Sequence, residues 1–165
     1  MIVGTFSSKV ALAQAAAWDA AQVIRAAIAE RGEARIIAAT GASQFEFLDA
    51  LTGMGGIRWD MGIVHGRESR RSMPQAATGR GLVLYARGCA SPGDSMTIHQ
   101  IMHSKQILCI VPGARKASAV KTCFEGDISP MAPASILRRH PNTRIYLDAE
   151  SASLLSQSVI EAYRA

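Results

Sequence analysis

Aromatic residues are scarce in this sequence, at 5% of 165 residues, and none of them interleaves with a basic run. A platform that stacks the bases of single-stranded nucleic acid is therefore not supported. No apolar run approaches the roughly 20 residues needed to cross a bilayer, so we expect no membrane partner. The N-terminal stretch has no basic segment before an apolar block, and Asp19 interrupts it, which argues against a secretory signal.

Cysteine is also sparse, and the three present, Cys89, Cys109 and Cys123, have no CxxC-type spacing. An odd number without such pairs predicts neither a disulfide framework nor a zinc site. We expect reduced structural thiols, a cytoplasmic protein and no metal. No serine is accompanied by histidine and aspartate in a recognisable triad, so nucleophilic hydrolysis has no support.

What is present suits one compact domain over residues 1–165. Hydrophobic residues make up 48% and charged residues 19%, which is enough apolar material for a core and too little charge for a disordered chain. The formal net charge is +5. A positive balance suits anionic partners in general, from a sugar phosphate to RNA.

The first half of the chain alternates helix and strand patterns. Apolar residues at helical spacing predict a helix over 8–31 that Gly32 ends. A short apolar run at 35–39 predicts a strand, and 44–51 a second helix. Residues 61–65 suit another strand. Residues 66–95 are rich in Gly, Arg, Ser and Pro and are expected to be irregular, with an unassigned apolar island at 82–85.

The second half repeats the alternation. We expect a short helix over 97–103, a buried strand over 106–111, and a helix that ends at Gly126. A short helix begins at Pro133, a strand covers 144–147, and a last helix starts at Ser151. Alternating strands and helices predict an α/β fold with a mainly parallel sheet covered on both faces.

Two loops have the composition of a phosphate site. The first, Thr40-Gly41-Ala42-Ser43, joins a strand to a helix and combines hydroxyl donors with a glycine that admits close approach to the backbone. The second, residues 111–117, also opens a helix and carries Lys116 in its first turn, where the helix dipole disfavours a cation unless an anion is near. Each loop read alone also fits an ordinary turn with an N-cap serine or a solvated lysine. Together they lie at the sheet edge where ligands bind in open α/β folds.

The segments that contain these two loops resemble a known family. The run VPGARKASAVKTCFEGDISPMAPASILRRHPNTRIYLDAESASLL resembles the closing third of glucosamine-6-phosphate deaminases and isomerases, and IIAATGASQFEFLDAL resembles their first strand, loop and helix. The resemblance implies a Rossmann-like three-layer αβα sandwich, truncated relative to the family. It also implies a homo-oligomer, no cofactor, and a phosphorylated amino sugar held by Thr40, Gly41, Ala42, Ser43 and Lys116.

The same resemblance supplies candidates for proton transfer. The family's catalytic stretch His-x-Asp-Glu-Tyr is matched by His65-Gly66-Arg67-Glu68-Ser69, which leaves His65 and Glu68 as the catalytic candidates. Arg67 stands where the family has its basic aspartate, and a guanidinium cannot accept a proton. The family's Asp-Gly-His loop, which supplies a ring-opening histidine, has no counterpart in this sequence.

These departures leave several hypotheses open. The chain is an active deaminase of reduced size, or a catalytically silent descendant that binds phosphosugars, or a hydrolase related to 6-phosphogluconolactonase. A nucleic-acid-binding module rests only on net charge and on arginine clusters at 67–71 and 138–139, so no specific nucleic acid is expected. His99 and His103 lie four residues apart on one helix face, a spacing that fits a metal pair, but no third ligand of suitable spacing appears. The run Leu137–His140 is expected to have a local structural or interface role.

Overall fold

A computed structural model describes residues 1–38, 44–65, 81–85 and 98–163 of the chain. The strands are β1 (Ile2–Phe6), β2 (Ala34–Ala38), β3 (Gly62–His65), β4 (Gly81–Tyr85), β5 (Gln106–Val111) and β6 (Thr143–Asp148). The α-helices are α1 (Lys9–Arg31), α2 (Phe45–Thr52), α3 (Ile98–Met102), α4 (Ala117–Glu125) and α5 (Gln157–Ala162). Short 3-10 helices are η2 (Trp59–Met61), η3 (Ala114–Lys116) and η4 (Pro133–Arg139).

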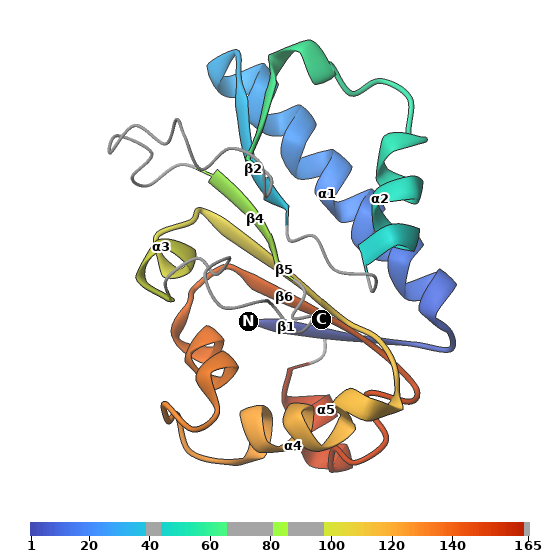
Figure 1. The fold of residues 1–165 in the computed structure, drawn as a ribbon, viewed down its shortest axis with the longest axis vertical. Helices are drawn as coiled ribbons and strands as arrows, with labels where there is room; N and C mark the ends of the chain where they lie inside the picture. The colour runs from blue at the N-terminus through green and yellow to red at the C-terminus, as the bar shows by residue number, and fades with distance from the viewer. Residues whose placement is uncertain (39–43, 66–80, 86–97, 164–165) are drawn as a thin grey trace.

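The strands form one parallel sheet in the order β1-β6-β5-β4-β2-β3. In Figure 1, α1 and α2 lie on one side of this sheet and α4 and α5 on the other. The result is the predicted three-layer αβα sandwich, with a parallel sheet covered on both faces. Because all strands are parallel, their carboxyl ends emerge along one edge.

Alternation along β5 explains why two separate cores form. Leu108 and Ile110 belong to the core under α1 and α2, whereas Ile107 and Cys109 belong to the core under α3, α4 and η4. All four side chains are at most 5% exposed. Successive strand residues point to opposite faces, so a strand covered on both sides must be apolar throughout. This is why 106–111 is the most readable strand in the sequence.

Helix α1 forms much as its sequence predicts. Ser8 accepts a hydrogen bond from the backbone N–H of Ala11 and caps the start, and Gly32 ends the helix with a φ of 77°. The buried face of the helix is built mainly from alanine, at positions 13, 16, 17, 20, 21 and 27. These small side chains allow α1 to pack closely against both the sheet and α2.

Three expectations about secondary structure were wrong. The segment Ile2–Phe6, not recognised in the sequence, is edge strand β1, paired with β6. The stretch 66–95 is not irregular throughout, because Gly81–Tyr85 is strand β4, inserted between β2 and β5. Residues 151–155 are turns, and the last helix begins at Gln157 instead of Ser151.

A polar clamp joins α1 to β6 across 125 residues of sequence. One carboxylate oxygen of Asp19 accepts hydrogen bonds from Arg144 Nη1 at 2.8 Å and from the Tyr146 hydroxyl at 2.6 Å. Tyr146 is 4% exposed. Burial, followed by the bond to Asp19, raises the pKa of this phenol well above its ordinary value. The hydroxyl therefore stays protonated and donates to Asp19.

The run Leu137–His140 has the local structural role expected of it. The Arg138 guanidinium donates to the carbonyls of Phe124 and Gly126, both at 2.8 Å, and so holds the C-terminus of α4. His140 is buried, with Nε2 at 2.8 Å from the carbonyl of Ser104 and Nδ1 at 3.0 Å from the Thr143 hydroxyl. Arg138 and His140 thus make hydrogen bonds within the protein that join neighbouring segments.

Glu125 links the end of α4 to the start of α5. Its carboxylate accepts from Lys121 Nζ at 2.5 Å and from the Ser156 N–H at 2.7 Å. The hydrogen bond from Lys121, then those from Ser156, lower the pKa of Glu125 from 4.5 to about 2. The charged form is therefore favoured by folding.

This pKa sets the pH dependence of one variant. A carboxyl whose pKa is lowered in the folded state stabilises the protein above its unfolded pKa, and that contribution disappears as pH falls through the folded value. We expect Glu125→Gln to melt below the wild type at pH 7, and the difference to shrink between pH 4.5 and about 2. Thermal melts across this range check it. Asp49→Asn, at an exposed position of α2, is the control, and a gap that stays constant with pH contradicts the prediction.

Neither cysteine in the described part of the chain, Cys109 or Cys123, forms a disulfide, as expected. Cys109 lies in β5, and its burial raises the pKa of the thiol to about 12. Such a thiol is not nucleophilic at neutral pH.

Among the described helices, none combines the length and the hydropathy needed to cross a bilayer.

Candidate functional site

The carboxyl edge of the sheet contains a point where the chain changes face. Strand β2 leads to α2 in the core that includes Phe47, whereas α3, which follows β4 in the chain, contributes Ile101 to the opposite core. Strands β2 and β4 are neighbours. In open α/β sheets, the crevice beyond two such strands is the usual place for a ligand.

Both predicted phosphate loops leave the sheet at this edge. Residues 40–43 lie outside the described residues, but Ala38, at the end of β2, pairs with Leu84 of β4, and Tyr85 pairs with Cys109 of β5. Only β4 therefore separates the strands that lead into the two loops. With neighbouring strands 4.7–4.9 Å apart, β2 and β5 are roughly 10 Å apart, which one phosphosugar can span.

The second loop holds Lys116 at the junction of two helices. The chain leaves β5 at Val111, turns at Gly113, and forms η3, of which Lys116 is the last residue before α4. Gly113 has φ 90° and ψ 145°, a conformation open essentially only to glycine. The Lys116 side chain is half-buried. Its position at the start of α4 agrees with the sequence prediction.

Two carboxylates from the end of β6 hold this loop. The N–H of Gly113 donates to both oxygens of Asp148, at 3.1 and 2.8 Å, and the N–H of Ala114 donates to Glu150 at 3.2 Å. Asp148 is 4% exposed and also accepts from the Ser151 N–H at 2.7 Å. These backbone donors are therefore already used within the protein. An anion at this loop must rely on donors other than these two N–H groups.

The sequence reasoning did not identify Asp148 as part of this edge. A signal was present, because an aspartate that directly follows a strand and stands three residues before a serine often forms a side-chain turn. The Ser151 hydroxyl completes that turn by accepting from the Asp148 N–H at 3.0 Å. The bond to Gly113 spans 35 residues and is not visible in any local pattern.

The start of α2 brings an ion pair to the same edge. Lys9 Nζ, from the start of α1, donates to Glu46 Oε1 at 2.5 Å. This hydrogen bond is the main cause of a lowered pKa of Glu46. The first turns of α1 and α2 are therefore tied together by charge.

The candidates for proton transfer are only partly located. His65 is the last residue of β3, and its backbone pairs with Ile37 of β2, so it too lies at the carboxyl edge. Glu68 and Arg67 lie outside the described residues. The catalytic assignment of His65 and Glu68 stays a prediction.

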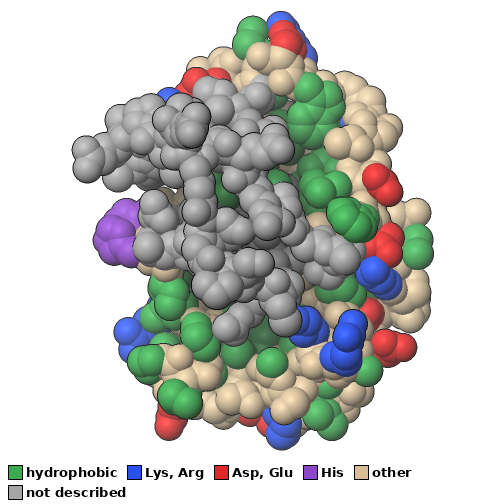
Figure 2. Space-filling model, in the orientation of Figure 1, with side chains coloured by type: hydrophobic (Ala, Val, Ile, Leu, Met, Phe, Trp, Pro, Cys, Tyr) green, Lys and Arg blue, Asp and Glu red, His purple; other side chains and the backbone are tan. Residues whose placement is uncertain are grey.

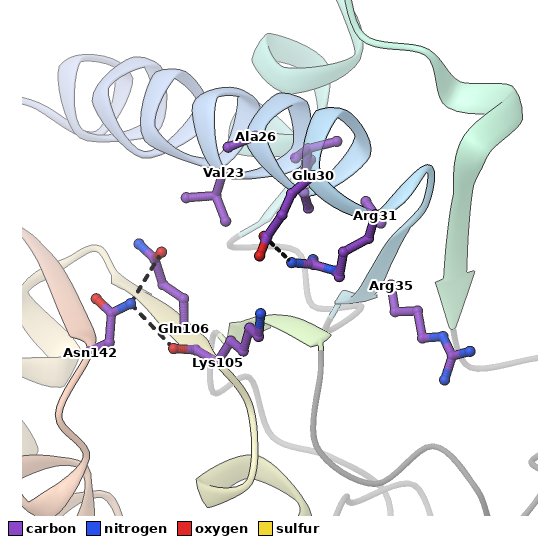
Figure 3. Close-up of a pocket in the computed structure, with 11 residues that line it drawn as sticks. Val23, Ala26, Glu30, Arg31, Arg35, Lys105, Gln106 and Asn142 are labelled. Atoms are coloured by element: carbon purple, nitrogen blue, oxygen red, sulfur yellow. Dashed lines mark hydrogen bonds and ion pairs between the residues drawn. The ribbon is translucent and has the colours of Figure 1, made fainter.

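A cavity of about 310 Å³ lies at the opposite edge of the sheet. Figure 3 shows it between the C-terminal half of α1 and the residues that begin β2 and β5. Glu30 pairs with Arg31 at 2.6 Å, and the Asn142 amide donates to the Lys105 carbonyl at 3.2 Å. These polar groups are satisfied by one another, and the cavity is remote from the carboxyl edge.

The histidine pair lies on the surface. His103 Nδ1 is 2.7 Å from the His99 carbonyl, and both residues are exposed. Figure 2 shows histidine side chains at the side of the molecule where α3 lies in Figure 1. Within the described ranges no group of three or more His, Cys, Asp or Glu side chains is placed to hold a metal ion.

Charged side chains of both signs are interspersed among the described residues on the face shown in Figure 2.

Comparison with known proteins gives a partial sequence match. No family model matches the chain. Glucosamine-6-phosphate deaminases of Bacillus cereus (strain G9842) and Bacillus thuringiensis (strain Al Hakam) are each 41% identical to it over 70 residues, which is 42% of this chain and 27% of the relative. The match thus spans about a quarter of the length of these curated relatives.

Solved structures share the fold at low identity. A 6-phosphogluconolactonase from Shewanella baltica OS155 has a TM-score of 0.74 at 14% identity, covering 90% of this chain and 98% of that one. A monomeric glucosamine-6-phosphate deaminase has a TM-score of 0.68 at 20% identity, covering 93% of this chain and 100% of that one. The matched segment is thus similar to glucosamine-6-phosphate deaminases, and the fold is the one shared by these solved deaminase and 6-phosphogluconolactonase structures.

Proposed function

We propose that this chain binds a phosphorylated amino sugar at the carboxyl edge of its sheet. Thr40, Gly41, Ala42 and Ser43 hold the phosphate from one side, and Lys116 holds it from the other. The observation that carries the proposal is that the strands leading into the two loops are separated only by β4. Relatives named glucosamine-6-phosphate deaminases support the amino sugar as the ligand.

Lys116 supplies the charge in this arrangement. Asp148 and Glu150 already occupy the N–H groups of Gly113 and Ala114, so the positive side chains of this loop, Lys116 and the exposed Arg115, are its strong donors toward an anion. A hydrogen bond between charged groups contributes about 1.5–3 kcal/mol. Removal of Lys116 is therefore expected to weaken binding roughly tenfold to a hundredfold.

Catalysis is the second part of the proposal. Ring opening and proton transfer between C2 and C1, with release of ammonia, need an acid–base group beside those atoms. His65 and Glu68 are the candidates, because Arg67 cannot accept a proton. A chain with neither group in position is a phosphosugar-binding protein without turnover.

Ligand-induced stabilisation tests the binding site. Thermal melts with glucosamine-6-phosphate, fructose-6-phosphate and inorganic phosphate are expected to show a rise of roughly 5–10 °C at a hundredfold excess over Kd. Lys116→Ala is expected to lose most of this rise. Lys105→Ala is the matched control, because it removes one exposed lysine at the opposite edge of the sheet. An unchanged wild-type melt across the panel contradicts the proposal.

A coupled assay for ammonia at high enzyme concentration separates an active deaminase from a silent phosphosugar-binding descendant. Release by the wild type above the Lys116→Ala background supports an active deaminase. Binding without release supports the silent descendant. Hydrolysis of 6-phosphogluconolactone, followed by the carboxylic acid that it releases, tests the related hydrolase.

A further inference from the structure

Gln44 stands at the start of α2, directly after the first phosphate loop. Its side chain is 1% exposed, although the residue begins a helix at the carboxyl edge of the sheet. A residue at that position normally turns its side chain back to accept from the first helical N–H groups. Gln44 does not, and its backbone is already helical, with φ −99° and ψ −11°.

The Gln44 amide is buried without a hydrogen-bond partner. Within the described part of the chain four buried side-chain polar atoms lack a partner, and three of them belong to the first turn of α2 and its cap: Gln44 Nε2, Gln44 Oε1 and Glu46 Oε2. Buried polar groups are satisfied in the great majority of native structures. A concentration of unsatisfied atoms at the carboxyl edge of the sheet, where open α/β folds bind ligands, is a reason to look for a ligand that satisfies them.

We infer that Gln44 is a specificity-determining residue that hydrogen-bonds the sugar of the phosphosugar, not its phosphate. A carboxamide offers one acceptor and two donor hydrogens, which matches sugar hydroxyl or amino groups that both donate and accept. An anion offers only acceptors and would leave the Gln44 oxygen unpaired. The unpaired Glu46 oxygen, also an acceptor, favours the same donor-bearing ligand. This inference rests on the proposed function.

An apolar replacement of the same shape separates a ligand contact from a structural one. Gln44→Met removes the amide and keeps the length of the side chain. If the amide is unpaired in the free protein, its loss does not lower the melting temperature. We expect the variant to bind glucosamine-6-phosphate about tenfold more weakly by calorimetry and to bind inorganic phosphate as the wild type does. Gln22→Met, at an exposed position of α1, is the matched control.

The outcomes distinguish the two proposals. Wild-type sugar affinity in Gln44→Met, beside normal binding by the wild type, overturns the role of Gln44 and leaves the site intact. If the free variant melts at a lower temperature and loses affinity for sugar and inorganic phosphate alike, the amide supports the loop instead of contacting the sugar. That result also overturns the role of Gln44. If the wild type itself binds no phosphosugar, the proposed function fails and this inference fails with it.

Discussion

Asp148→Ala is expected to lower the free energy of unfolding by about 3 kcal/mol, because two backbone N–H groups lose a charged acceptor. Asp148 is 4% exposed, and its carboxylate accepts hydrogen bonds from the N–H of Gly113, in the Lys116 loop, and from the N–H of Ser151, in its own turn. Ser151 is fully buried, so water cannot replace the lost acceptor. Urea unfolding measures the loss.

The same substitution is expected to weaken phosphate binding. Gly113 is in a conformation essentially confined to glycine, with φ 90°. The bonds to Asp148 help to hold this turn and therefore the position of Lys116, three residues later. Without them the position of the ammonium is no longer fixed. The rise in the variant's melting temperature on adding inorganic phosphate, compared with the rise in the wild type, reports this effect.

Glu150→Ala is the matched control for Asp148→Ala. Glu150 also accepts from the loop, at Ala114, but its side chain and that N–H are exposed. Water replaces an exposed acceptor, so the loss is expected to stay within about 0.5 kcal/mol. Asp148→Asn is expected to fall between the two, because its amide oxygen still accepts one set of bonds. Equal effects of Asp148→Ala and Glu150→Ala contradict the positioning role.

Asp19→Ala is expected to lower the free energy of unfolding by about 2–3 kcal/mol. The substitution leaves the buried Tyr146 hydroxyl without the partner that it has at 2.6 Å, and it also removes the acceptor of Arg144. An unpaired buried hydroxyl costs about 1–3 kcal/mol. Because Asp19 lies on α1 and its partners lie on β6, the damage falls on the packing of helix against sheet. Chemical unfolding measures it.

A double mutant tests the cause. Asp19→Ala combined with Tyr146→Phe removes the hydroxyl together with its acceptor and keeps the ring. We expect the double mutant to be about 1 kcal/mol more stable than Asp19→Ala alone, so the two changes are not additive. If the losses of unfolding free energy from the two single substitutions simply add, Asp19 and Tyr146 are not energetically coupled.

Much of the fold can be read from local sequence. The helix over 9–31 follows from its spacing of small apolar residues and from the Gly32 stop, and β5 follows from an apolar run buried on both faces. Both signals depend on neighbouring residues alone. The position of the Lys116 loop, between β5 and α4, is predictable for the same reason.

Pairing between distant segments decided the rest. Ile2–Phe6 has no strong strand pattern of its own, and the apolar island at 82–85 is too short to be assigned alone. Each becomes a strand by pairing with neighbours far away in sequence, such as β6 for β1 and β5 for β4. The contacts of Asp148 with Gly113 and the burial of an unpaired Gln44 amide likewise exist only once the sheet and helices are assembled. The sequence by itself determined most of the helices and strands, such as α1 and β5, because those depend on local periodicity. Only the tertiary structure decided which loops share an edge and which polar groups there are already satisfied, because hydrogen bonds between distant strands leave no local trace.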